Sequence, residues 1–203
     1  GDYGKYTVNT GFSLGVLMFA WEHFEDRLAC ADFGAAGSGG LPQYLAEVRW
    51  GMAWLLKMQR KEDGRAYHKL TPSHFAGFGD MPEDDGSKRF YAPWSTSATG
   101  TLAAAAAQAS RVFARHDRDF SERCLRAARK AYAALAAHPE EQKPDLSAFG
   151  TGTYVMYDNG DWDTGIRLWA AAELFEATGE APFLADAEAH LAHFGAPAAS
   201  CGE

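Results

Sequence analysis

STSATGTLAAAAAQASRVFAR, residues 95–115, is the stretch that decides the fold. It begins with serines that can cap a helix and continues through the unbroken alanine run 103–107. Alanine is the strongest helix former, and its small side chain lets neighbouring helices approach closely. The stretch therefore predicts a central helix that starts at Ser95 or Ser97, reaches about Arg115, and packs through the alanine run.

Five further segments carry apolar residues at helical spacing, and they are residues 10–28, 42–64, 120–137, 164–178 and 182–194. Pro42 stands in a favoured first-turn position, and Gly179 and Gly195 close the last two segments. No stretch alternates apolar and polar residues long enough to predict a strand, and residues 154–157 come nearest. Arg111, Arg115, Glu122, Arg126 and Arg129 are expected on a solvated helix face. The pattern predicts an all-α chain of about six helices.

The connections between these helices differ in length. Residues 115–119 and the residues around Gly179 form short turns, which predict helical hairpins. Residues 63–94 and 139–163 form long connections that are rich in aromatic, His and Asp residues, and loops of this length are usually functional or disordered. Stacked hairpins place all long loops on one face. Because the hairpins share no repeated motif, a closed α/α toroid is favoured over a solenoid.

Composition excludes several classes of function. The 203 residues carry a net charge of −8 and no basic run longer than two, so no nucleic-acid partner is expected. The longest apolar run, residues 14–21, is far too short to span a membrane. The three cysteines form neither a disulfide framework nor a metal motif. An acidic chain with 13 Phe, 8 Tyr and 6 Trp suits carbohydrate binding.

Several segments, in the same order, resemble a known family. GDYGKY at residues 1–6, EVRWGMAWLLKMQ at 47–59, YHK at 67–69, PWSTSAT at 93–99 and WAAAELFEATGE at 169–180 resemble glycoside hydrolase family 9, the cellulase-type enzymes. In that family the first segment reads D-A-G-D-Y-G-K-Y. The resemblance implies an (α/α)6 toroid, of which residues 1–203 would supply the N-terminal half of the catalytic domain, with no second domain.

The resemblance also implies chemistry. Family members hydrolyse β-glycosidic bonds with inversion, using one carboxylate as general base and another as general acid. By resemblance Asp2 is the base, while the acid is expected outside this chain, and so is the first Asp of the family motif. His68, Tyr157 and Trp162 are implied as substrate contacts, Trp162 as a sugar-stacking platform in the loop before the fifth helix.

No metal and no other cofactor is expected. Some family members bind calcium through an Asp-Glu pair, but Gly165 and Ile166 stand at those positions here. Asp158, Asp161 and Asp163 could ligate a cation, although a calcium cage needs six to eight oxygen donors.

Three functions remain open from the sequence. The first is endo-hydrolysis of cellulose or a related β-1,4-glucan, the second is exo-hydrolysis of short oligosaccharides, and the third is a non-catalytic helical or sugar-binding fragment. The isolated chain is expected to be inactive, because the acid and half of the barrel lie elsewhere. Its expected partners are the β-linked glucan and the missing C-terminal half, and its expected location is secreted or periplasmic.

Overall fold

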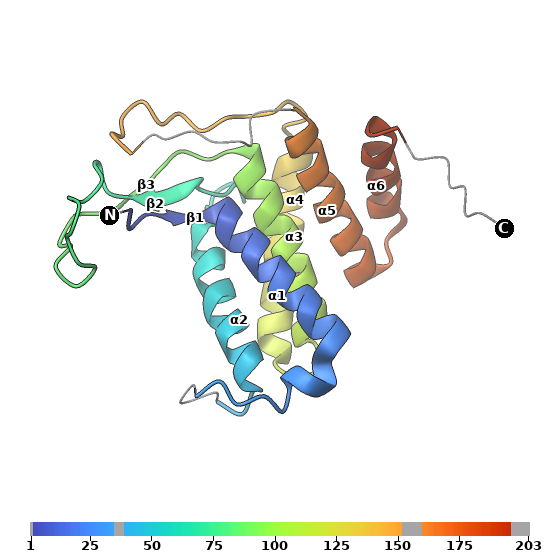
Figure 1. Cartoon of the computed structure of the whole chain (residues 1–203). Coiled ribbons are helices and arrows are strands. Elements are labelled where there is room, and N and C mark those ends of the chain that lie inside the picture. The colour runs from blue at the N-terminus through green and yellow to red at the C-terminus, as the bar shows by residue number, and fades with distance from the viewer. Residues whose placement is uncertain (1, 35–38, 152–159, 196–203) are drawn as a thin grey trace.

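The computed structural model describes residues 2–34, 39–151 and 160–195. Its helices are α1 (Thr7–Leu28), α2 (Gln43–Leu55), α3 (Thr96–Phe113), α4 (Arg118–Ala136), α5 (Gly160–Thr178) and α6 (Ala181–His193), with a 3-10 turn η1 at Leu56–Met58. Three short strands, β1 (Lys5–Tyr6), β2 (Lys69–Thr71) and β3 (Phe90–Tyr91), form one antiparallel sheet in that order (Figure 1). No helix among the described residues is both long enough and apolar enough to cross a membrane.

The helices form two layers, an inner layer of α1, α3 and α5 and an outer layer of α2, α4 and α6. Helix α3 lies between α1 and α5, and each of α2, α4 and α6 packs on the helix that precedes it. The short turns between α3 and α4 and between α5 and α6 lie at one end of the hairpins. The described parts of the long connections after α2 and α4 lie at the other end, on one face as predicted, and the sheet lies there as well (Figure 1). Any site built from long loops therefore belongs to the sheet end.

Helix α3 begins and packs as its sequence predicts. The Ser95 hydroxyl accepts a hydrogen bond from Ala98 N at 3.1 Å and caps the helix. All five residues of the alanine run are fully buried. A β-carbon placed on Gly100 would lie only 2.5 Å from Ile166 Cγ2, so glycine is what allows α5 to approach. Small side chains thus set the spacing between the helices of the inner layer.

Two predicted features are wrong. The second helix stops at Leu55 rather than reaching Gly64, because Gln59 turns extended and pairs with Ala66 in an isolated bridge. Gly64 instead sits in the intervening turn, with φ of +81°. The sheet was not predicted, since strands of two or three residues are too short to show alternation. Residues 154–157, which came nearest to a strand pattern, lie outside the described residues.

Arg111 is not on a solvated face. Its guanidinium lies between Glu22 of α1 and Glu173 of α5 and pairs with both carboxylates. Burial raises the pKa of Glu173, and Arg111 acts against that shift. This ion triad joins the three helices of the inner layer near the end that carries the short turns.

Candidate functional site

Asp2 is held at the sheet end by contacts with its own segment. Gly4 N donates to Asp2 Oδ1 at 2.9 Å, and the Tyr6 hydroxyl donates to Asp2 Oδ2 at 2.6 Å. The Tyr3 hydroxyl donates to the carbonyl of Asp80, which fastens the segment to the loop between β2 and β3. Asp2 itself is exposed. Each carboxylate oxygen keeps a lone pair for a further donor, such as a water molecule or a substrate hydroxyl.

His68 stands directly before β2 and is only 8% exposed. Its carbonyl accepts from Thr7 N at 3.1 Å, which links it to the start of α1. Its Nδ1 lies 2.9 Å from Ser95 Oγ, the cap of α3. Burial, with a smaller effect from the Lys69 charge, lowers the pKa of His68 to about 4. The imidazole is therefore neutral near pH 7 and can offer one donor and one acceptor.

The ladder between β1 and β2 brings these two segments together. Tyr6 is the register partner of Lys69, and Lys5 is the register partner of Leu70. His68 and Asp2 thus belong to neighbouring segments of one sheet, although 66 positions separate them in sequence. Tyr6 and Lys69 carry no signal in the sequence that marks them as site residues. Their pairing depends on strand register, which two-residue strands do not reveal in the sequence.

The segment before α3 is also built on the sheet. Tyr91 of β3 stacks on Tyr67, with ring centroids 4.5 Å apart. Arg89 pairs with Asp85 at 2.7 Å within the loop that precedes β3. These contacts place half-exposed aromatic surface beside the strand that follows His68.

Of the two predicted substrate contacts near α5, Tyr157 and Trp162, the structure describes only Trp162. Tyr157 lies outside the described residues. Trp162 is not in a loop as predicted but in the first turn of α5, which begins four residues earlier than its apolar pattern indicated. Its side chain is 39% exposed and lines an apolar cavity of about 470 Å³ together with Phe12, Ile166 and Trp169. Its predicted role in sugar stacking stays a prediction.

The aspartates near α5 are engaged with basic side chains. Asp163 accepts from Arg167 Nε at 2.7 Å, and Asp161 contacts His193 at 2.9 Å. Asp158 is outside the described residues. Ile166, one of the two positions at which the resemblance implies a calcium-binding pair in some family members, is a buried core side chain. Within the described ranges no group of three or more His, Cys, Asp or Glu residues could hold a metal ion.

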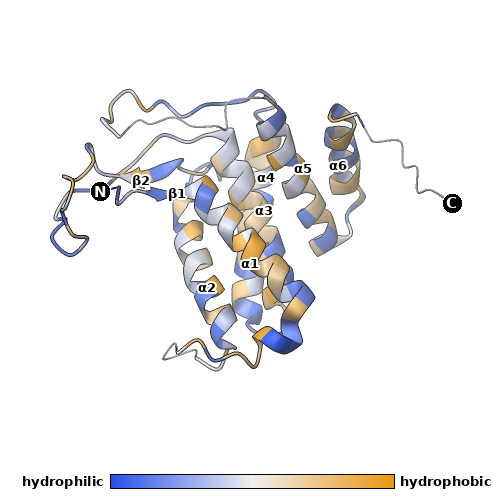
Figure 2. Cartoon of the chain, viewed as in Figure 1, coloured by the Kyte–Doolittle hydropathy of each residue, from blue (hydrophilic) through white to orange (hydrophobic). Residues whose placement is uncertain are grey.

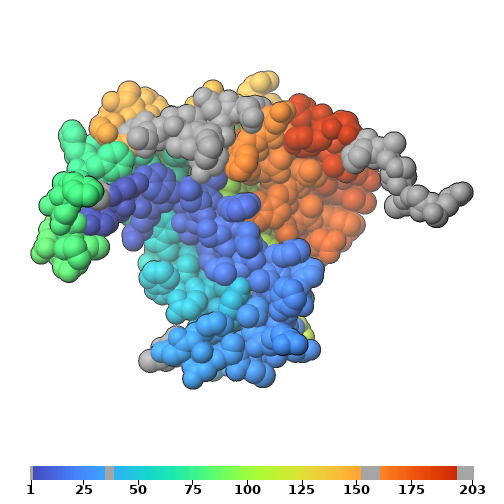
Figure 3. Space-filling view, in the orientation of Figure 1, coloured from blue at the N-terminus to red at the C-terminus, as the bar shows by residue number. Residues whose placement is uncertain are grey.

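A second surface runs along the flank of the inner layer, and we call it the α1–α5 face. It comprises Phe12, Val16 and Phe19 on α1 and Trp162 and Trp169 on α5. Phe12 is 57% and Phe19 is 56% exposed. Apolar residues follow the visible side of α1 in Figure 2, and Figure 3 shows the surfaces of α1 and α5 side by side.

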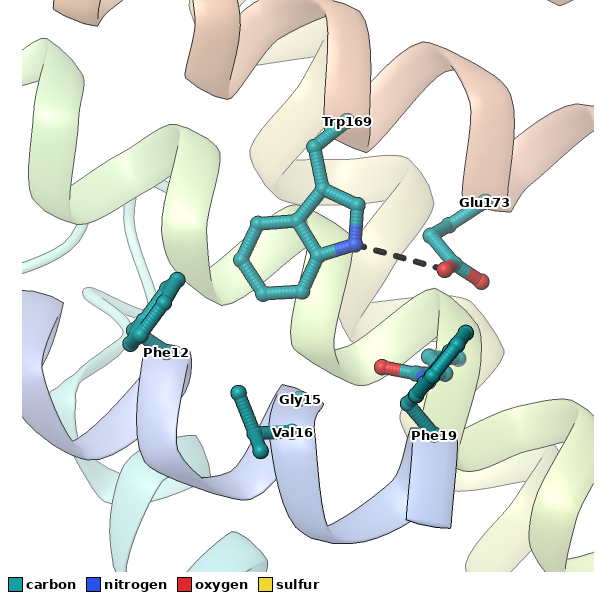
Figure 4. A pocket seen from close by; sticks show the side chains of 7 residues that line it. Phe12, Gly15, Val16, Phe19, Trp169 and Glu173 are labelled. Atoms are coloured by element: carbon teal, nitrogen blue, oxygen red, sulfur yellow. Dashed lines mark hydrogen bonds between the residues drawn. The ribbon is translucent and has the colours of Figure 1, made fainter. Parts of the chain in front are cut away.

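A cavity of about 300 Å³ opens in the α1–α5 face. Phe12, Val16 and Phe19 border it from α1, and Trp169 and Glu173 border it from α5 (Figure 4). Trp169 Nε1 donates to Glu173 Oε1 at 3.3 Å, and the indole packs directly on Gly15. Exposed apolar patches of this kind mark interaction surfaces or ligand-binding grooves.

Comparisons with known proteins agree on one family. The family model described as "Glycosyl hydrolase family 9" matches residues 1–200. Endoglucanase D of Acetivibrio thermocellus is 37% identical over 196 residues, which is 96% of this chain and 31% of the relative. The xyloglucan-specific endo-beta-1,4-glucanase BoGH9A of Bacteroides ovatus is 37% identical over 192 residues, which is 89% of this chain and 32% of the relative.

The solved structure of the family 9 endoglucanase J30 superposes with a TM-score of 0.86 at 32% identity. The match covers 96% of this chain and 36% of that chain. The superposition confirms the predicted fold class, an all-α portion of an (α/α)6 barrel. The chain thus spans about a third of the length of the curated relatives it matches.

Proposed function

The chain belongs to glycosyl hydrolase family 9, and we propose that it supplies the general base, Asp2, for inverting hydrolysis of β-1,4-linked glucan. The observation that carries this proposal is the geometry of Asp2. Its carboxylate is exposed, yet each oxygen is already oriented by a donor from its own segment. A base that must take a proton from one particular water molecule needs this combination of access and fixed direction.

In this mechanism a water molecule sits between Asp2 and the anomeric carbon. The water oxygen bonds to the anomeric carbon as Asp2 accepts its proton, and the glycosidic C–O bond breaks as the oxygen of the leaving sugar receives a proton from the general acid. In inverting enzymes the two carboxyl groups stand roughly 6.5–9.5 Å apart, which leaves room for the water. We place the acid in the part of the barrel that residues 1–203 do not contain.

His68 and the aromatic side chains of the long connections bind the sugar in this proposal. A neutral His68 ring hydrogen-bonds a sugar hydroxyl, while Ser95 fixes the plane of the ring. Two relatives are named for endoglucanase activity, one of them on xyloglucan, which supports a β-1,4-glucan backbone as the substrate. A polymer of this kind is met outside the cytoplasm, so we propose a secreted or periplasmic location. No cofactor takes part in the proposed reaction.

We further propose that the remaining helices of the barrel cover the α1–α5 face. Phe12, Val16 and Phe19 lie on the flank of the inner layer, where a closed toroid continues with its next helices. The structure of J30 is nearly three times as long as the part matched here, which leaves ample chain to close the ring.

A chimera tests the catalytic proposal. Residues 1–203 replace the matching third of Endoglucanase D, so that the relative supplies the rest of the barrel. We expect the chimera to release reducing sugar from carboxymethylcellulose, and Asp2→Asn to lower kcat by about 10²–10⁴-fold. Asp26→Asn, an exposed aspartate on α1, is the matched control and should leave kcat unchanged.

The stereochemistry of the product completes this test. Proton NMR of the first product formed should show the α-anomer, as inversion requires. An Asp2→Asn chimera as active as its parent would contradict the role of Asp2, and a β-anomeric first product would contradict inversion.

A further inference from the structure

Asp2, Gly4 and Tyr6 pack so closely that the carboxylate has little freedom. A β-carbon on Gly4 would lie 3.0 Å from Asp2 Oδ1 and 3.3 Å from the Tyr6 ring. The two hydrogen bonds reach different oxygens of the carboxylate, Oδ1 from the backbone N–H of Gly4 and Oδ2 from the Tyr6 hydroxyl. The backbone donor fixes one oxygen, and the phenol fixes rotation of the carboxylate about that point.

The Tyr6 ring is itself held from the sheet. Tyr6 and Lys69 are opposite each other in the ladder between β1 and β2. Lys69 Nζ lies 5.4 Å from the centroid of the Tyr6 ring, within the range of a cation–π contact. The same ammonium donates to the carbonyl of Thr151, which prevents it from swinging away.

Lys69 is an unusual residue to find here, because only 1% of it is exposed. A buried ammonium is costly unless nearby groups compensate its charge. Burial lowers the pKa of Lys69, and the charge of Asp2 acts in the opposite direction. The Lys69 cation and the Asp2 anion therefore stabilise each other across the Tyr6 ring.

The phenol is well suited to remain a donor. Burial, the hydrogen bond to Asp2 and the charge of Asp2 all raise the pKa of Tyr6, in that order. The hydroxyl thus keeps its proton throughout the pH range in which a carboxylate base works. It gives Asp2 a fixed partner and does not compete with the carboxylate for the proton of the water.

We propose that Tyr6 is the positioning residue of Asp2, and that Lys69, paired opposite Tyr6 in the sheet, holds the Tyr6 ring in place. The proposal rests on the proposed function, since it explains how the base is aimed. It assigns no chemical step to Tyr6 or Lys69. It also gives the three-stranded sheet a function, which is to connect the segment of His68 to the orientation of Asp2.

NMR on the 203-residue chain labelled with ¹³C and ¹⁵N tests the proposal without any need for catalysis. Three-bond couplings from the backbone N and C′ to Cγ of Asp2 report its χ1 rotamer, and exchange of the Gly4 amide reports its hydrogen bond to Oδ1. The variant is Tyr6→Phe, which removes one oxygen and keeps the ring over Lys69. The matched control is Tyr3→Phe, whose hydroxyl donates to Asp80 rather than to Asp2.

In the unmodified chain and in Tyr3→Phe, we expect the couplings of a single Asp2 rotamer. In Tyr6→Phe we expect averaged couplings and a loss of Gly4 amide protection of about fivefold, the size of one modest hydrogen bond. A single unchanged rotamer in Tyr6→Phe would overturn the proposal, and so would equal averaging in both variants. Because the chimera with Asp2→Asn tests hydrolysis separately, either proposal can fail while the other stands.

Discussion

Acid should destabilise this protein through His68. The folded-state pKa of His68 is about 4, below the ordinary value of 6.5, because the ring is buried beside the Lys69 charge. The folded chain therefore binds fewer protons at this residue than the unfolded chain. Its contribution to stability is fully present above pH 6.5 and is lost as the pH falls towards 4.

The size of the effect follows from the two pKa values. At pH 5 the unfolded imidazole is almost fully protonated, whereas the folded one is largely neutral. The free energy of unfolding should consequently fall by about 2 kcal/mol between pH 7 and pH 5 from this residue alone. The pKa of His190 is also lowered, so the unmodified chain loses somewhat more than this amount in total.

Urea unfolding at pH 7 and pH 5 measures the effect, with His68→Gln as the variant and the exposed His23→Gln as the control. The difference between the two pH values should shrink by about 2 kcal/mol in His68→Gln and should stay as in the unmodified chain in His23→Gln. If His68→Gln loses as much stability on acidification as the unmodified chain, the ring is not held neutral by burial. The reasoning about its role in sugar binding would then fail as well.

Three other variants probe the inner layer. Gly100→Ala should lower the free energy of unfolding by about 1–3 kcal/mol in urea, because its β-carbon would lie 2.5 Å from a methyl group of α5, and unchanged stability would show that α5 can move aside. Arg111→Met should lower the free energy of unfolding in urea by about 3–5 kcal/mol at pH 7, because it leaves Glu173 without its cation. The loss should be smaller at pH 5, because burial raises the pKa of Glu173 and its carboxylate becomes neutral as the pH falls. An equal loss at both pH values would refute this. Because the α1–α5 face is uncovered in the isolated chain, we expect that chain to self-associate through it. Phe12→Ser should then weaken this association about tenfold in sedimentation velocity, while Trp50→Ser on α2 should not, and the reverse order would place the association surface elsewhere.

The helical part of the fold was predictable because its signals are local. Ser95 caps α3, alanines fill the central layer, and Gly179 ends α5 with φ of +69°. The Ser95 cap and Gly179 act through their immediate neighbours in the chain, and the alanine run favours a helix by its own propensity. The start of α5 was less clear, because Gly160, Asp161 and Trp162 show no helical apolar pattern, and the helix is anchored there by the bond between Asp163 and Arg167.

The candidate site was only partly predictable. Asp2 and His68 were found through resemblance, since a single Asp or His in a loop carries no signal of its own. Tyr6 and Lys69 were missed because they become neighbours only through the register of β1 and β2, which the sequence does not show. A buried lysine is also indistinguishable in sequence from the solvated lysines around it, so its burial had to come from the structure.

The sheet end and the α1–α5 face differ in how far each depends on the rest of the barrel. At the sheet end, Asp2 already has its donors within its own segment, so the proposed base is oriented without help from other helices. The α1–α5 face, in contrast, leaves Phe12 and Phe19 more than half exposed, and covering each ring would contribute about 1.5–3 kcal/mol. Adding the helices that close the barrel should therefore stabilise the chain greatly, and it should leave the rotamer of Asp2 unchanged. On the proposed mechanism, the base is therefore oriented by its own segment, and the remaining helices would contribute the general acid.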